Sequence, residues 1–262
     1  IGGLITFAGS VHGTYYNLKY FQELSEIPLF IAADYERGLG TFINGTLFPP
    51  NMAIAATGDI NNSAIQGEII AKEARALGVN MILAPVVDIN NNINNPIINI
   101  RSYGDNPKIV TQYSIPFINA VQKEGLLSCV KHYPGHGNTS TDSHTSLPII
   151  NINQNELYNN ELYPFHQACK NGVKAVMVGH ILIPSIDSSP STFSDKITRK
   201  ILREDWNFNG LIITDALEMG ALTSTTWHGE SVIKAIEAGA DILLLPIDGI
   251  KAINSVYDAV IN

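Results

Sequence analysis

One segment of the chain gathers side chains that can transfer protons. Residues 131–148, KHYPGHGNTSTDSHTSLP, hold three histidines, a lysine and an aspartate among glycine, serine and threonine. This composition predicts a loop, and a loop rich in titratable groups is a candidate active site. Asp142 stands two residues before His144, so its carboxylate can reach the imidazole and fix its tautomer. Such a pair can act as a general acid and base.

More ionisable side chains stand where short apolar runs end. Five runs end in this way, at Asp34, at Asp88, at Lys131 with His132, at His180 and at Asp215. A charge buried at a strand end must be paired or functional, because an unpaired buried charge is costly. Any single case could be structural, and Asp215 could simply cap a following helix. Five cases favour one shared site.

The elements that position these residues alternate regularly along the chain. Seven near-continuous apolar runs, rich in Ile, Val and Leu, are typical of parallel strands buried on both faces. These runs cover residues 3–7, 29–33, 80–86, 127–132, 175–180, 211–215 and 241–245. Amphipathic segments between them predict helices over residues 63–77, 107–124, 155–171, 194–204 and 230–238. Strand and helix in alternation indicate repeated βα units.

The fold class predicted from these units is α/β, a TIM-type (β/α)8 barrel with its first strand missing from the chain. A closed barrel needs eight strands and about 250 residues, and its active site lies at the C-terminal ends of the strands. The chain begins inside an apolar run, so we expect the missing strand upstream of Ile1 and further domains in a longer polypeptide. An open doubly wound sheet is the alternative, but residues 38–45, GLGTFING, lack the G-x-G-x-x-G spacing. No linker divides the chain, so we expect one domain over residues 1–262.

Composition excludes several classes of protein. A chain that is 45% hydrophobic and 15% charged is not intrinsically disordered. A net charge of −8 gives no basic surface for nucleic acid or anionic membranes. No apolar run approaches the roughly 20 residues that span a bilayer. Cys129 and Cys169 are too few for a disulfide framework or a zinc site of their own.

Four segments, in order, resemble the motifs of glycoside hydrolase family 3, in its single-domain β-N-acetylglucosaminidase branch. They are IAADYERGLG at residues 31–40, INIRSYG at 98–104, KHYPGHG with the later TDSH, and GLIITDALEMGAL at 210–222. The resemblance implies a TIM-type barrel and retaining, exo-acting hydrolysis of β-linked N-acetylglucosaminides such as cell-wall fragments. It also implies a small carbohydrate as partner, no cofactor or metal, and a place in the cytoplasm.

The resemblance assigns roles to individual residues. Asp215 is implied as the nucleophile that forms a covalent glycosyl-enzyme. The acid and base, in most retaining glycosidases a second carboxylate, is implied to be His144 assisted by Asp142. Histidine suits both tasks, because its ordinary pKa of about 6.5 lies near neutral pH. The sugar-binding residues implied by the resemblance are Asp34, Arg101, Lys131 and His132.

One position departs from the family pattern. Family members often carry an arginine eight residues after the sugar-binding aspartate, and this chain has Phe42 there. Arg37 is the nearby candidate to replace it. The fine substrate specificity is therefore open at this stage.

Other readings of the same residues remain open. Lys131 at a strand end could form a Schiff base, as in class I aldolases. His132, His136, Asp142 and His144 could instead hold a metal. A phosphorylase is a third alternative, since a histidine in place of a glutamate would not repel phosphate. A β-glucosidase or xylosidase of the same fold, and a non-catalytic sugar-binding barrel, complete the set.

Overall fold

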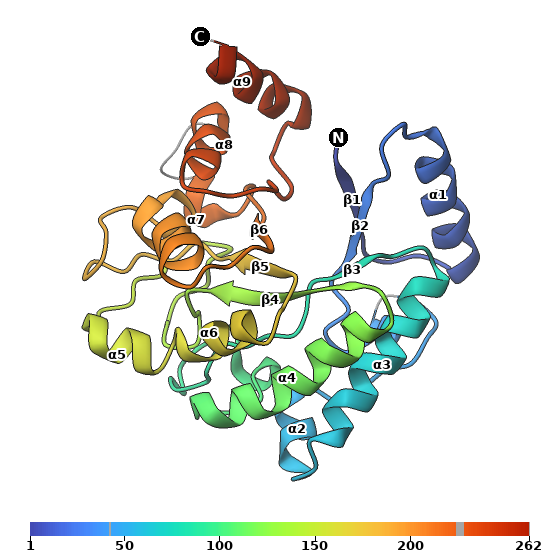
Figure 1. Cartoon of the computed structure of the whole chain (residues 1–262), viewed down its shortest axis with the longest axis horizontal. Helices are drawn as coiled ribbons and strands as arrows, with labels where there is room; N and C mark the ends of the chain where they lie inside the picture. Colours follow the sequence, from blue (N-terminus) through green and yellow to red (C-terminus); the bar gives the residue numbers. More distant parts are fainter. Residues whose placement is uncertain (42, 224–227, 262) are drawn as a thin grey trace.

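A computed structural model describes residues 1–41, 43–223 and 228–261 (Figure 1). Its centre is a six-stranded sheet in which neighbouring strands are parallel and follow chain order. The strands are β1 (Gly3–Thr6), β2 (Phe30–Ala33), β3 (Met81–Ile82), β4 (Leu127–Tyr133), β5 (Ala175–Val178) and β6 (Leu211–Thr214). In Figure 1 the steep strands β1 and β2 give way to a crosswise β4, so the sheet curls like half of a barrel.

The seventh predicted strand is present only as an extended segment beside β6. Ile242 forms an isolated parallel bridge with Ile213, and the Asp241 amide donates to the Ile212 carbonyl over 2.8 Å. In the part of the chain that the structure describes, no hydrogen bond joins this segment to β1. The observed fold is therefore an α/β fold with a curled, open parallel sheet, and closure into an eight-stranded barrel stays a prediction.

Helices connect the strands as the βα pattern requires. They are α1 (Val11–Leu24), α2 (Asn51–Ala56), α3 (Asn61–Ala76), α4 (Pro107–Lys123), α5 (Gln154–Asn159), α6 (Tyr163–Lys170), α7 (Gly220–Thr223), α8 (His228–Glu237) and α9 (Gly249–Ile261), with a π-helical segment η4 (Lys196–Asp205) before β6. The predicted helices over 63–77, 107–124, 194–204 and 230–238 are confirmed within a few residues. No described helix is long and apolar enough to cross a membrane.

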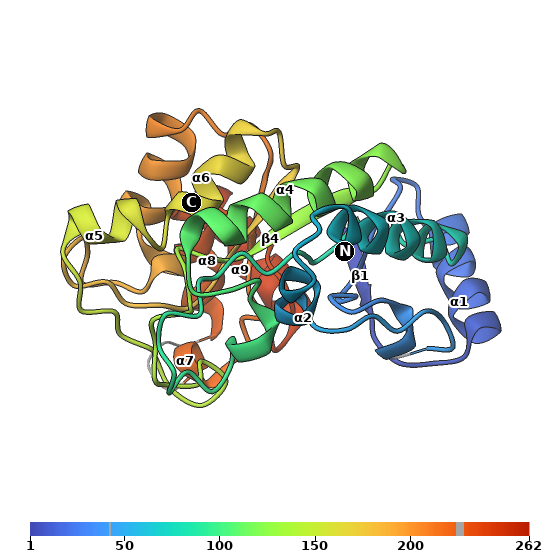
Figure 2. The same ribbon diagram turned by 90° about the horizontal axis from the view of Figure 1, so that it is seen from below.

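The long helices α3 and α4 lie side by side against one face of the sheet (Figures 1 and 2). A Cβ atom on Gly67 of α3 would come within 2.7 Å of the Phe117 carbonyl oxygen of α4. Glycine is therefore required at residue 67 for the two backbones to approach this closely.

The single helix predicted over residues 155–171 is wrong, because the structure breaks it into α5 and α6. Asn160 leaves the helical conformation, with φ of −115° and ψ of −85°, and Pro164 stands in the first turn of α6. Proline cannot donate a helical hydrogen bond but fits the first turn of a new helix. Between the helices, Glu161 is buried, and its Oε1 accepts a hydrogen bond of 2.9 Å from the side-chain amide of Asn91.

The concave side of the sheet holds a small apolar core of alternating strand residues. Its fully buried members are Ala32, Met81, Leu83, Cys129, Ala175, Met177 and Ile213. Side chains two residues apart on a strand share a face. Asp34, Lys131 and Asp215 each follow a core residue by two positions, so a charged layer succeeds the apolar one at the C-terminal ends of β2, β4 and β6.

Candidate active site

A cavity of about 250 Å³ opens at this charged layer. Its lining includes six residues singled out from the sequence, which are Asp34, Arg101, Lys131, His132, His144 and Asp215. Asp142, the seventh, does not line the cavity but is hydrogen-bonded to His144. The structure thus brings together residues from the C-terminal parts of β2, β4 and β6, from the short 3-10 helix Asn99–Arg101 and from one long loop.

Asp215 follows β6 and is held by backbone contacts. Its amide donates to the Val178 carbonyl over 2.8 Å, and its Oδ1 accepts from the Ala216 amide over 2.8 Å. Burial would raise the pKa of Asp215, but electrostatic interaction with the rings of His132 and His180, the Ala216 N–H and Lys131 together outweigh it and hold this pKa below its ordinary value. The carboxylate is therefore ionised at neutral pH, as a nucleophile must be.

Asp142 and His144 form the pair expected from their spacing. The His144 Nδ1–H and the His144 backbone amide both donate to Asp142 Oδ1, each over 2.8 Å. Among the described residues no group bonds to Nε2 of this ring, and the side chain is 65% exposed. Nε2 is consequently the nitrogen that can exchange a proton with a molecule in the cavity.

A network of opposite charges lies beside the cavity. The ammonium group of Lys131 is buried and forms ion pairs with Asp34 and with Oε1 of Glu36, the latter at 2.8 Å. Glu36 also accepts two hydrogen bonds from Arg101, at 2.6 Å from Nη2 and 3.0 Å from Nε. Burial opposes the charge of Glu36, but Lys131 and Arg101 outweigh it and keep its pKa far below the usual range. This two-pronged arginine contact fixes the guanidinium plane.

Glu36 is a residue that the sequence reasoning missed. It stands in IAADYERGLG, two positions after Asp34, within a segment already singled out. Its spacing from Asp34 was a usable signal, since residues two apart in an extended chain point the same way. Its partners, however, are 65 and 95 positions away in the sequence and could not be read from it.

Asp88 organises the two histidines of KHYPGHG. Its side chain is fully buried, and Oδ2 accepts from His132 Nδ1 over 2.7 Å and from the His132 amide over 3.0 Å. Oδ1 accepts from the His136 amide over 2.6 Å. Arg101 Nη2 lies 3.4 Å from His132 Nε2, and a guanidinium group only donates, so Nε2 accepts. The sequence placed Asp88 at a strand end but not among the site residues.

His180 supports the site from behind. Its buried ring donates from Nε2 to the Ala216 carbonyl over 2.9 Å and contacts Thr192 Oγ1 through Nδ1 over 2.6 Å. Burial lowers the pKa of His180, although the nearby Asp215 charge works against it. The ring therefore braces the residue that follows Asp215.

Arg37 does not take the place of an arginine in the cavity. Its Nε donates to the Phe48 carbonyl over 3.1 Å, and the side chain is absent from the described cavity lining. Phe42, the position at which the family pattern has its arginine, lies outside the described residues.

Two alternative chemistries fit this geometry poorly. A Schiff-base lysine needs a neutral amine, whereas the carboxylates of Asp34 and Glu36 overcome burial and raise the pKa of Lys131. For the metal reading, no group of three or more His, Cys, Asp or Glu side chains is placed to hold a metal within the described ranges. His132 and His136 instead direct their nitrogens to protein groups.

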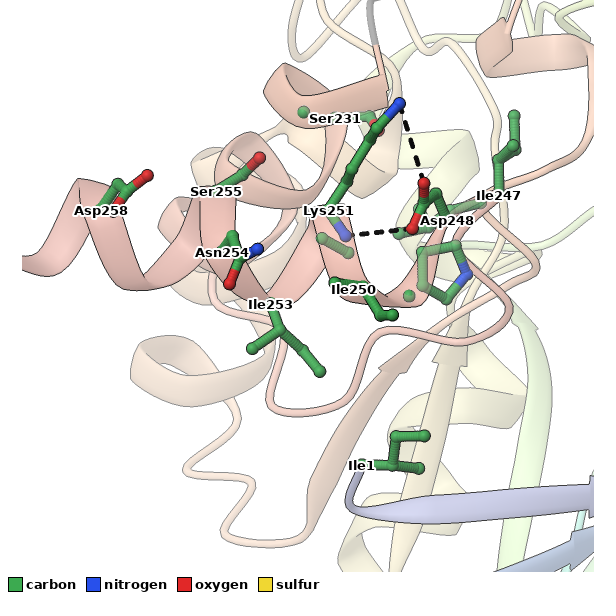
Figure 3. Close-up of a pocket in the computed structure, with 15 residues that line it drawn as sticks. Ile1, Ser231, Ile247, Asp248, Ile250, Lys251, Ile253, Asn254, Ser255 and Asp258 are labelled. Carbon is green, nitrogen blue, oxygen red and sulfur yellow. Dashed lines mark hydrogen bonds and ion pairs between the residues drawn. The ribbon is translucent and has the colours of Figure 1, made fainter.

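A second, larger hollow of about 760 Å³ lies elsewhere, between α9, the start of α8 and Ile1 (Figure 3). Its polar lining residues are Ser231, Asp248, Lys251, Asn254, Ser255 and Asp258, and the Lys251 ammonium group stands 3.8 Å from the Asp248 carboxylate. None of the candidate site residues lines this hollow. The residues singled out for catalysis and sugar binding therefore gather at the smaller cavity.

Comparison with known proteins identifies the family of this chain. Residues 1–262 match the Glycosyl hydrolase family 3 N terminal domain. The chain belongs to glycosyl hydrolase family 3. It is 36% identical over 275 residues to β-hexosaminidase A of Pseudoalteromonas piscicida, covering 94% of this chain and 46% of that protein. The chain thus spans about half the length of this relative.

Solved structures of family 3 enzymes share the fold. A β-N-acetylglucosaminidase of this family from Paenibacillus sp. strain FPU-7 superposes with a TM-score of 0.95 at 35% identity, covering 99% of this chain and 52% of that one. A β-glucoside phosphorylase superposes with a TM-score of 0.95 at 28% identity, covering 98% of this chain and 49% of that one. The half-barrel described above is accordingly the fold of the family's N-terminal domain.

Removal of Glu36 tests the charge network. Glu36→Ala leaves Lys131 buried with one partner fewer and removes the carboxylate that accepts two hydrogen bonds from Arg101. We therefore expect a loss of about 3–5 kcal/mol in the free energy of unfolding. Glu36→Gln keeps an oxygen that accepts from Arg101 and should lose less. Urea denaturation measures both. Glu68→Gln, which breaks the exposed ion pair with Lys72, is the matched control and should change nothing measurable. Equal midpoints for Glu36→Ala and the control would contradict the network's role.

The dependence of stability on pH follows from the same carboxylates. Glu36 and Asp88 have folded-state pKa values below their ordinary ones, so the unfolded chain binds more protons in acid. The stability they contribute is complete above about pH 4.5 and is lost as the pH falls through their folded-state values. We expect the urea midpoint to fall from pH 5 to pH 3, and to fall less steeply in Asp88→Asn. An unchanged slope in that variant would argue against an ionised Asp88.

Proposed function

We propose that this domain catalyses retaining, exo-acting hydrolysis of β-linked N-acetylglucosaminides through a covalent intermediate on Asp215. The observation that carries the proposal is that an ionised carboxylate and an aspartate-oriented histidine face one cavity from different elements. Membership in family 3 and the names of the relatives support the same class of reaction. The proposed natural substrate is a cell-wall fragment with a terminal β-linked N-acetylglucosamine.

In the first step, Asp215 attacks the anomeric carbon while the bond to the leaving oxygen breaks. The proton on Nε2 of His144 passes to that oxygen, and the sugar becomes an ester of Asp215. Asp142 stabilises the orientation of the ring through its bond to Nδ1. Because proton transfer depends on geometry, a fixed ring is what general acid catalysis requires.

In the second step, Nε2 of His144 takes a proton from water, and the resulting nucleophile attacks the same anomeric carbon. The bond to Asp215 breaks and its carboxylate is restored. Two inversions give net retention of configuration. Histidine serves both steps because its ring is neutral after it gives its proton to the leaving oxygen, and protonated again after it takes one from water.

The sugar is held by the charged residues at the strand ends. Asp34 accepts hydrogen bonds from hydroxyl groups, while Lys131 and Arg101 donate them, and His132 lies beside Arg101. Hydrogen bonds that involve a charged partner are about twice as strong as neutral ones. Glu36, which lies behind Lys131 and Arg101, keeps both cations in place.

A second candidate function is phosphorolysis of the same class of glycoside. A similar structure is that of a β-glucoside phosphorylase, and a histidine acid/base places no negative charge next to an incoming phosphate. A β-glucosidase or xylosidase differs only in the sugar that the cavity accepts, and a sugar-binding domain would bind without turnover. The first experiment below separates these cases.

Turnover of a panel of aryl glycosides tests the proposal. We expect the N-acetylglucosaminide to be hydrolysed faster than the glucoside and the xyloside, with no acceleration by phosphate and no sugar phosphate as product. Asp215→Ala should lower kcat by at least about a thousandfold while circular dichroism shows an unchanged fold. Ser114→Ala, which removes a buried hydroxyl from α4, is the control. A glycosidase activity that survives in Asp215→Ala would refute the assignment of the nucleophile.

The acid role of His144 predicts a dependence on the leaving group. We expect His144→Ala to lower kcat/KM by about 10²–10⁴-fold for an alkyl or methoxyphenyl glycoside. A dinitrophenyl glycoside needs little protonation and should lose far less. The measurement is kcat/KM across a series of phenols of known pKa. Losses of the same size along the whole series would rule out general acid catalysis by this residue.

A further inference from the structure

The residue between the two members of the acid/base pair is buried in the wall of the cavity, next to His136. Ser143 is only 3% exposed, whereas the side chain of its neighbour His144 is 65% exposed. The Ser143 hydroxyl lies 3.0 Å from Nε2 of His136, a ring that is itself buried. The loop therefore presents its reactive imidazole outward and is attached inward through the adjacent serine.

His136 links this serine to the rigid part of the site. Its Nδ1 contacts Thr139 Oγ1 over 2.7 Å, and its backbone amide donates to buried Asp88 over 2.6 Å. Burial, with the neighbouring His132 ring, lowers the pKa of His136, so the ring is neutral. A neutral imidazole donates at one nitrogen and accepts at the other, so it can bind both hydroxyls.

The opposite side of the loop contacts the segment that carries Asp215. The Gly220 amide donates to the His144 carbonyl over 3.1 Å, and the Ala221 amide donates to the Ser143 carbonyl over 3.2 Å. A Cβ atom at Gly220 would stand 2.5 Å from the His144 carbonyl oxygen. Glycine is therefore required at residue 220 by lack of space.

We propose that His136, Ser143 and Gly220 form a clamp that sets the position of His144 relative to Asp215. This inference rests on the proposed function, in which His144 passes a proton to the leaving oxygen while Asp215 forms the bond to the sugar. The three clamp residues act through His144 and Asp142, and are thus positioning residues. Asp215 has its own backbone supports at Val178 and Ala216, so loosening the clamp displaces the acid and spares the nucleophile.

The consequence is a selective kinetic defect. A misplacement of about 1 Å can lower a rate about a hundredfold when the displaced group takes part in the step. The step that kcat/KM reports is the one in which His144 gives its proton to the leaving oxygen, so the defect in kcat/KM should grow with the pKa of the leaving group. A variant that merely unfolds more easily would lose the same fraction of activity on every substrate.

The test uses Ser143→Ala and Gly220→Ala across the aryl N-acetylglucosaminide series. We expect kcat/KM to fall about 10- to 100-fold for the poorest leaving group and less than about threefold for dinitrophenol. Ser114→Ala and Gly249→Ala are the matched controls, since Ser114 is a buried serine in α4 and a Cβ at Gly249 meets no atom within 4 Å. Neither control should change the dependence on the leaving group. Losses independent of the leaving group, or no loss in either variant, would overturn the clamp.

Hydrogen exchange supplies a readout that does not depend on activity and that can begin with the wild-type protein. In the wild-type protein the amides of Gly220 and Ala221 should exchange slowly, because both donate to loop carbonyls; exchange at the rate of an open chain would overturn the clamp. In Ser143→Ala both should exchange faster, while α4 stays unchanged. If the wild type turns over no glycoside, the proposed function fails, and the exchange data still decide whether the loop is held as described.

Discussion

The arrangement of this site depends on a buried ammonium group. Lys131 lies at the end of the central strand β4, with its side chain 3% exposed, and a cation in that place is tolerated only with partners. Asp34 and Glu36, both in the segment that follows β2, supply them. Glu36 in turn fixes Arg101, and Arg101 reaches His132. One requirement for charge compensation thus brings together residues from three separate parts of the chain.

Asp88 plays the corresponding role for His132 and His136. Its two oxygens accept three hydrogen bonds from His132 and His136, so the first half of the KHYPGHG segment is fixed before the loop leaves the sheet. Burial opposes the charge of Asp88, yet those donors hold its pKa below the ordinary value. The start of the loop is therefore fixed to the sheet through Asp88, and the part that carries His144 is held separately through Ser143 and Gly220.

The curled sheet explains how a chain with few charged residues forms a cavity lined by many of them. Side chains alternate along each strand, so an apolar layer inside the curl is followed two residues later by a polar one. Parallel strands all place that polar layer at the same edge. The low charged fraction of the chain and the density of charge in the cavity are two aspects of one arrangement, because most of the interior excludes ions and the strand ends collect them.

The sequence by itself determined the features that depend on local spacing. Apolar runs and their glycine-ended helices predicted the order of βα units, the strand ends located Asp34, Lys131 and Asp215, and the interval between Asp142 and His144 predicted their contact. Contacts between distant residues were decided only by the tertiary structure: the pairing of Glu36 with Arg101, that of Asp88 with His132, and the approach of Gly220 to the loop. It also broke the predicted helix over 155–171 and turned Arg37 toward Phe48. The physical reason is that spacing and periodicity report neighbours within a few residues, whereas a buried charge selects its partner by distance in space.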